Sequence, residues 1–146
     1  MKSAVLLAAA AITLAPAVQA ADYKSVGAAP AIMYDAPSER GRKVFIAPRG
    51  MPVEVILSYG DWAKVRDVTG DLSWVEAKAL DARRHVIVNV AGAKVRSTAD
   101  EAAPAVFSAE RGVLLELAEP ISSGWVKVRH RDGQGGYIRA ADIWGD

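Results

Sequence analysis

The residues with the clearest capacity for chemistry lie in one short motif that occurs twice. The first copy reads GDWAKVR at residues 60–66, and the second reads SGWVKVR at residues 123–129. A further aromatic residue follows each copy, Trp74 in the first and Tyr137 in the second. An exposed aromatic ring beside cations is a candidate contact for a ligand. The motif therefore predicts that the protein binds a ligand through these aromatic and cationic side chains.

Each motif is predicted to form the first strand of a β-hairpin. Side chains alternate along a strand, so Trp62, Lys64 and Arg66 share one face, while Ala63 and Val65 share the other. The second copy follows the same alternation. We expect the valines to point into a core and the aromatic and cationic residues to lie at or near the surface.

The turn of each hairpin decides which residues face each other. A turn centred on Val68 places Trp62 directly across from Trp74, and the same geometry places Trp125 across from Tyr137. We expect Trp62 and Trp125 to act as contact residues. For Trp74 and Tyr137 a structural interpretation is equally open, in which the two rings cap a small barrel.

Residues for covalent or metal chemistry are sparse. The chain has no cysteine, which excludes a cysteine nucleophile, and its two histidines, His85 and His130, occupy non-equivalent positions of the repeat. No paired-histidine spacing for zinc occurs. Asp61, Asp67 and Asp71 cluster around the hairpin turn and are explained as turn residues. We therefore expect no enzyme activity, no metal and no cofactor.

Residues 1–20 have the pattern of a secretory signal peptide. Lys2 precedes an apolar run at 4–14, and small residues follow at 18–20, so cleavage is expected after Ala20. The apolar run is shorter than the roughly 20 residues of a membrane span. We expect an exported bacterial protein of the periplasm with no membrane span in its mature form. An uncleaved anchor is the alternative.

The charge balance of the mature chain limits its partners. Removing Lys2 from the 18 Lys and Arg residues leaves 17, which equals the 17 Asp and Glu residues. A neutral chain lacks the large cationic surface that binds nucleic acids or anionic membranes. We therefore expect no nucleic-acid partner. Without disulfides, the protein must be held together by core packing.

The whole mature chain is a duplication. Tyr23 matches His85 and Met33 matches Val95 at a spacing of 62 residues. Short β-type runs separated by glycine and proline recur in both halves. This pattern is typical of a small all-β barrel, so it predicts one barrel in each half. The predicted domains are 21–82 and 83–146. The strand at 86–90 is expected to be buried on both faces between the two copies.

The motif order resembles an SH3-type domain. Arg-Gly, a hydrophobic strand, Gly-Trp-Val-Lys-Val-Arg, a turn, Gly-Gly-Tyr-Ile and a final short turn follow one another, best in residues 124–143. Behind a signal peptide, the similar proteins are the bacterial SH3-like (SH3b) domains, which implies two tandem SH3-like small β-barrels. In eukaryotic SH3 domains the tryptophan equivalent to Trp62 and Trp125 lines a groove for extended proline-rich peptides. Tyr34 matches a groove tyrosine, and some bacterial relatives bind cell-wall peptides.

Two functions follow as hypotheses. The first is a recognition module whose partner is an envelope protein or a peptidoglycan peptide. Its candidate ligand-binding residues are Tyr34, Trp62, Lys64 and Trp74 in the first copy and Arg96, Trp125, Lys127 and Tyr137 in the second. The alternative is a structural adaptor or self-associating protein with no soluble ligand, in which the aromatic faces are covered by the other copy or by another subunit.

Overall fold

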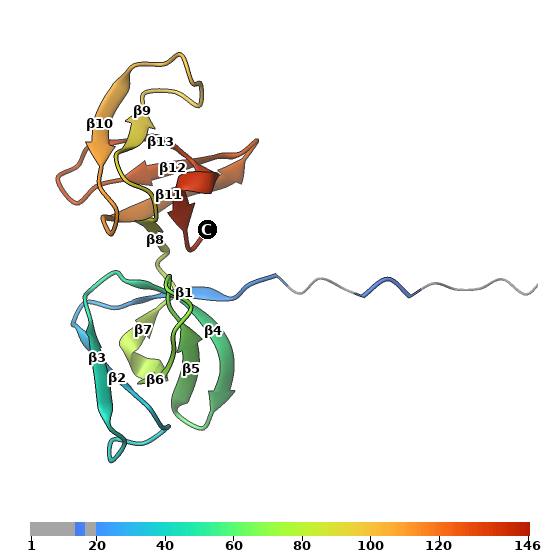
Figure 1. The fold of residues 1–146 in the computed structure, drawn as a ribbon, viewed down its shortest axis with the longest axis vertical. Coiled ribbons are helices and arrows are strands. Elements are labelled where there is room, and N and C mark those ends of the chain that lie inside the picture. Colours follow the sequence, from blue (N-terminus) through green and yellow to red (C-terminus); the bar gives the residue numbers. More distant parts are fainter. Residues whose placement is uncertain (1–13, 17–19) are drawn as a thin grey trace, which may run out of the picture.

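The computed structural model describes residues 14–16 and 20–146. Almost all of the predicted signal peptide therefore lies outside the described residues. Within the described part of the chain, the secondary structure consists of β-strands and two short 3-10 turns (Figure 1). The strands form two separate seven-stranded antiparallel sheets, one in each half of the chain. The predicted all-β class and the tandem arrangement are thus confirmed.

The first sheet has the strand order β3-β2-β6-β5-β4-β1-β7. A 3-10 turn, η1, connects the last two strands of this half in sequence. The elements are β1 (Tyr23–Val26), β2 (Ala31–Tyr34), β3 (Lys43–Ala47), β4 (Pro52–Tyr59), β5 (Trp62–Arg66), β6 (Leu72–Glu76), η1 (Ala77–Ala79) and β7 (Leu80–Asp81).

The second sheet repeats this topology in the order β10-β9-β13-β12-β11-β8-β14. Its elements are β8 (His85–Val88), β9 (Ala93–Arg96), β10 (Ala105–Ala109), β11 (Leu114–Ser122), β12 (Trp125–Arg129), β13 (Gly135–Arg139), η2 (Ala140–Asp142) and β14 (Ile143–Trp144). Each half therefore contains a complete copy of the same sheet.

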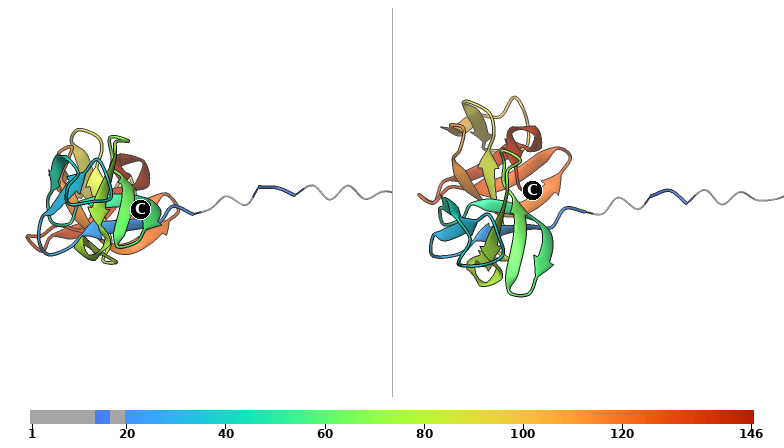
Figure 2. Two further views of the ribbon diagram at one scale, coloured as in Figure 1. Left: turned by 90° about the horizontal axis from the view of Figure 1, so that it is seen from below. Right: turned by 60° about the horizontal axis from the view of Figure 1, so that its bottom comes forward.

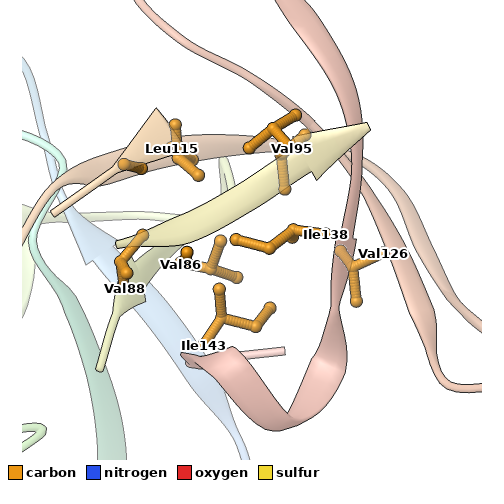
Figure 3. Packing of buried hydrophobic residues seen from close by; sticks show 10 residues of the cluster. Val86, Val88, Val95, Leu115, Val126, Ile138 and Ile143 are labelled. Atoms are coloured by element: carbon orange, nitrogen blue, oxygen red, sulfur yellow. The ribbon is translucent and has the colours of Figure 1, made fainter. Parts of the chain in front are cut away.

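Each half also has its own hydrophobic core. The first contains Val65 and Val75, and the second contains Val128 and Ile138, all of which are fully buried as the alternation predicts. Figure 3 shows the aliphatic side chains of the second core pointing toward one another. Burying one such side chain contributes about 1.5–3 kcal/mol, so the two small sheets are held by many similar contributions.

The strand at the junction between the halves differs from the prediction. Val86 and Val88 of β8 are buried in the second core, whereas His85 and Ile87 are only half-buried. The reason is that β8 pairs with β11 and β14 within its own sheet. It therefore does not supply a core shared between the halves. The C-terminal end lies near this junction (Figure 2). There Arg84 Nη2 donates to the Gly145 carbonyl at 2.7 Å.

Candidate functional site

The hairpin register differs from the predicted one by two residues. Trp62 faces Glu76, and Trp74 faces Lys64 instead of Trp62. The cause is the turn, which is closed by a hydrogen bond between Asp67 N and Asp71 O at 3.0 Å and is therefore centred on Thr69. A shift of two residues keeps every side chain on its predicted face. The second hairpin shows the same shift.

The aromatic residues of the first half form a cluster around Tyr34. Its ring packs edge-to-face against Trp62 with centroids 5.4 Å apart, and Tyr34 is paired with Trp74 between β2 and β6. Lys64 Nζ lies 5.9 Å from the Trp74 ring, whose other neighbour is the exposed Tyr59 at 6.5 Å. Tyr34 is only 7% exposed, so it supports Trp62 and offers little surface to a ligand. Sequence reasoning missed Tyr59, although it directly precedes the first motif.

Trp62 lies at the edge of a groove of about 660 Å³. The groove is bounded by the β2–β3 loop at 37–40, by Gly60 and Asp61 before β5, and by residues 76–78 around η1. Asp61 O accepts the Ala77 N–H at 2.8 Å, which ties two of these walls together. Three segments distant in sequence thus position one half-buried indole beside an open surface. Lys64 and Trp74 are outside the lining of this groove.

The groove carries a small excess of negative charge. Glu39, Asp61 and Glu76 line it together with Arg40 and Lys78. Glu76 and Lys78 form an ion pair at 3.0 Å. The hydrogen bond from Lys78 is the main cause that lowers the pKa of Glu76, and Glu76 in turn raises the pKa of Lys78. Two carboxylates and one guanidinium remain in the lining, so the groove favours a cationic group over an anionic one.

The corresponding tryptophan of the second half is covered. Trp125 is only 8% exposed, and the guanidinium of Arg139 lies 4.9 Å from its ring centroid. Arg139 is itself hydrogen-bonded and ion-paired to Glu101, which belongs to the loop between β9 and β10. The prediction that Trp125 lies at the surface is therefore wrong. The reason is that Arg139 lies over the indole and is held there by its ion pair with Glu101.

Comparison with known protein families explains the repeated topology. The family model described as the bacterial SH3 domain matches residues 27–82 and again residues 89–145. The chain belongs to this family. Bacterial SH3 domains generally act as binding modules and are typical of exported or wall-associated proteins. The resemblance to SH3b domains noted in the sequence is thus confirmed for both halves.

Several solved structures are similar to the tandem bacterial SH3 domains. NlpC2 from Trichomonas vaginalis matches 88% of this chain with 49% of its own, at 14% identity and a TM-score of 0.40. NlpC1 from Trichomonas vaginalis matches 96% of this chain with 51% of its own, at 13% identity and a TM-score of 0.41. An NlpC/P60 family protein from Bacillus cereus matches 84% of this chain with 56% of its own, at 16% identity and a TM-score of 0.38. The chain spans about half the length of these proteins. No curated protein matches the chain in sequence.

The remaining candidates of the second bacterial SH3 domain lie together on one face. Arg96 is paired with Tyr137 between β9 and β13, and Lys127 Nζ lies 5.9 Å from the Tyr137 ring. Both cations are already engaged within this domain. Arg96 donates to the Ala103 carbonyl at 2.9 Å, and Lys127 forms an ion pair with Glu119 at 3.2 Å.

The histidines and carboxylates of the described residues form no cluster of metal ligands. In residues 14–16 and 20–146, no three His, Cys, Asp or Glu side chains lie close enough together to hold a metal ion. Each histidine has its own local environment. Burial is the main cause that lowers the pKa of His85. His130 Nδ1 lies 3.2 Å from the Asp132 carboxylate. The described part of the chain contains no helix that could span a bilayer.

Proposed function

We propose that this protein is an exported, non-catalytic binding module that holds an extended peptide in the groove beside Trp62. The peptide would belong to an envelope protein or to the cell wall. The observation that carries this proposal is the difference between the two domains. Trp62 is half-buried beside an open groove, whereas Trp125 is covered by Arg139. The first domain is therefore the recognition site.

The chemistry of the groove supports an extended, cationic ligand. The Trp62 ring offers an apolar surface that is held in place by Tyr34, so little conformational freedom is lost on binding. Glu39 and Asp61 provide negative charge from two different segments that line the groove. A peptide with a lysine or another free amino group beside an apolar segment would satisfy both features.

Export to the periplasm is part of the same proposal. It rests on the signal-peptide pattern at residues 1–20 and on the family, whose members are typical of exported or wall-associated proteins. In that compartment the ligands within reach are envelope proteins and the peptides of the wall.

The test is retention of the mature protein on purified sacculi and capture of peptides from an envelope extract. Trp62→Ala should lose most of the retention. Trp74→Ala is the matched control, because it removes a half-buried indole of the same domain that does not line the groove. Equal losses in both variants, or no loss in Trp62→Ala when circular dichroism shows both to be folded, would contradict the assignment to this groove.

A second candidate function is a self-associating or adaptor protein, and the edge strand of the first sheet favours it. β3 is one of the two edge strands of this sheet, and it exposes three consecutive apolar residues, Val44, Phe45 (51% exposed) and Ile46 (68% exposed). An apolar edge strand is a template for pairing with another chain. Light scattering over a range of concentrations decides this. Association that Ile46→Lys abolishes would support it, and a monomer at all concentrations would refute it.

A further inference from the structure

A second hollow lies at the junction of the two domains, away from the Trp62 groove. It encloses about 880 Å³, and both domains contribute to its lining. Its most distinctive feature is the number of basic side chains that line it. These are Arg49, Arg83, His85, Arg129, His130 and Arg131. They come from three segments of the chain, at position 49, at 83–85 and at 129–131, so only the folded arrangement brings them together.

The acidic residues of this cleft do not neutralise the arginines. Glu116 and Asp81 are the carboxylates in its lining. Glu116 Oε1 accepts from Arg129 Nη2 at 2.9 Å, which neutralises one guanidinium. Asp81 Oδ1 accepts the backbone N–H of Arg83 at 2.8 Å.

Three guanidinium groups therefore remain available in the cleft. Among the ion pairs of the described residues, none involves Arg49, Arg83 or Arg131. Three positive charges face the single remaining carboxylate of Asp81, in a chain whose mature part is neutral overall. The positive charge is thus concentrated in the cleft, whereas the molecule as a whole does not attract anions.

The walls of the cleft are fixed by contacts between the two domains. The His85 N–H donates to Ser25 Oγ at 3.0 Å, and Tyr23 packs edge-to-face against Trp144 with centroids 5.1 Å apart. The guanidinium of Arg84 lies 5.4 Å from the Tyr23 ring and donates to the Gly145 carbonyl. The backbones that carry the cations are therefore held in position before any ligand binds, which lowers the cost of binding.

We propose that the cleft between the domains binds a small anionic ligand with two or more phosphate or carboxylate groups. The planar guanidinium of arginine binds the oxygen pairs of both groups through two parallel hydrogen bonds. Arg49 comes from the first domain, Arg83 from the connection at 82–84 between β7 and β8, and Arg131 from the second domain, so a ligand with several anionic groups engages both domains at once. Val113 and Leu114 in the lining provide contact for an apolar part of the ligand.

The experiment is a titration of the mature protein at low salt, followed by two-dimensional NMR of the backbone amides and by calorimetry. Pyrophosphate represents the phosphate source, citrate represents the carboxylate source, and acetate is the singly charged control. We expect pyrophosphate, citrate or both to shift resonances of the cleft, and the stronger of the two identifies the source. Acetate binding as tightly as both multivalent anions would overturn the proposal, as would unchanged cleft resonances.

Variants test the role of the three arginines. Arg49→Gln, Arg83→Gln and Arg131→Gln should each weaken binding by roughly three- to tenfold, and the triple variant should abolish it. Arg40→Gln, which removes the same charge from the Trp62 groove, should bind the anion as the parent protein does. Equal affinity of a folded triple variant would refute the proposal. Trp62→Ala should also bind the anion normally, so failure of the peptide-binding proposal leaves this result unaffected.

Discussion

Replacing Arg139 by glutamate should uncover Trp125 and give the second domain the open surface that the first domain has. Arg139 occupies the position that corresponds to Glu76, and Glu101 occupies the position that corresponds to Glu39. In the first domain both positions are acidic and line the open groove. In the second domain the arginine binds Glu101 and covers the indole. The covered and the accessible tryptophan thus differ in the charge of the side chain at this one position, which is Glu76 in the first domain and Arg139 in the second.

The contacts of Arg139 set the size of the effect. Its interaction with the Trp125 ring contributes about 0.5–1 kcal/mol at an exposed site. Its ion pair with Glu101 involves two half-exposed side chains and contributes about 0.2–1 kcal/mol. Arg139→Glu should therefore lower the free energy of unfolding of the second domain by about 1–2 kcal/mol, because it also places two carboxylates side by side. The domain should remain folded, since none of its core side chains is altered.

The assay is quenching of tryptophan fluorescence by acrylamide. Trp62, Trp74 and Trp144 are replaced by phenylalanine, so that emission reports on Trp125 alone. In this background Arg139→Glu should shift the emission to the red and raise the quenching constant toward that of a protein whose single tryptophan is Trp62. Lys94→Glu is the control, because it makes the same change of charge at an exposed site of the same domain.

The reciprocal change provides an independent check. Glu76→Arg should pair with Glu39 and reduce the quenching of Trp62 in a protein that retains this tryptophan alone. The reasoning would be refuted if the quenching of Trp125 in a folded Arg139→Glu variant equalled that of the parent. It would also fail if Lys94→Glu produced the same increase.

Three further predictions follow from burial and packing. Because burial lowers the pKa of His85 below its ordinary value of 6.5, the unfolded chain takes up this proton first. The free energy of unfolding should therefore fall as the pH drops from about 6.5 to the folded-state pKa, and His85→Gln should remove this slope in urea titrations. Gly136→Ala should destabilise the second domain by about 1–3 kcal/mol in thermal unfolding, because the added Cβ overlaps the Arg96 carbonyl oxygen. Ile138→Ala, at a fully buried position, should cost about 2–5 kcal/mol in the same assay, with no loss of signal from the first core.

The fold was accessible from the sequence because its signals are local. Alternation along each strand is a property of neighbouring residues, so Val65, Val75, Val128 and Ile138 were placed correctly in the cores. Duplication at an almost constant spacing indicated that both halves adopt the same sheet. Even the error in hairpin register preserved the face of every side chain, since the shift was two residues.

The register itself was not accessible, because it depends on the geometry of one turn. Asp67 Oδ1 accepts the N–H groups of Thr69 and Asp71, which stabilises a longer turn than the one expected. Turn composition alone identifies a turn but does not distinguish these lengths. Trp62 was expected to face Trp74 across the hairpin, but it packs against Tyr34 from a different strand.

By itself, the sequence determined that this protein is a pair of repeated β-sheets with aromatic and cationic residues on one face of each hairpin. Only the tertiary structure decided that Trp62 borders an open groove while Trp125 is covered, and that Arg49, Arg83 and Arg131, which form no ion pair within the described residues, line one cleft at the junction between the domains. The physical reason is the sequence separation of the residues that interact. Strand periodicity is set by adjacent residues, whereas the cover of Trp125 depends on Glu101 and Arg139, which are 38 positions apart and meet only in the folded chain.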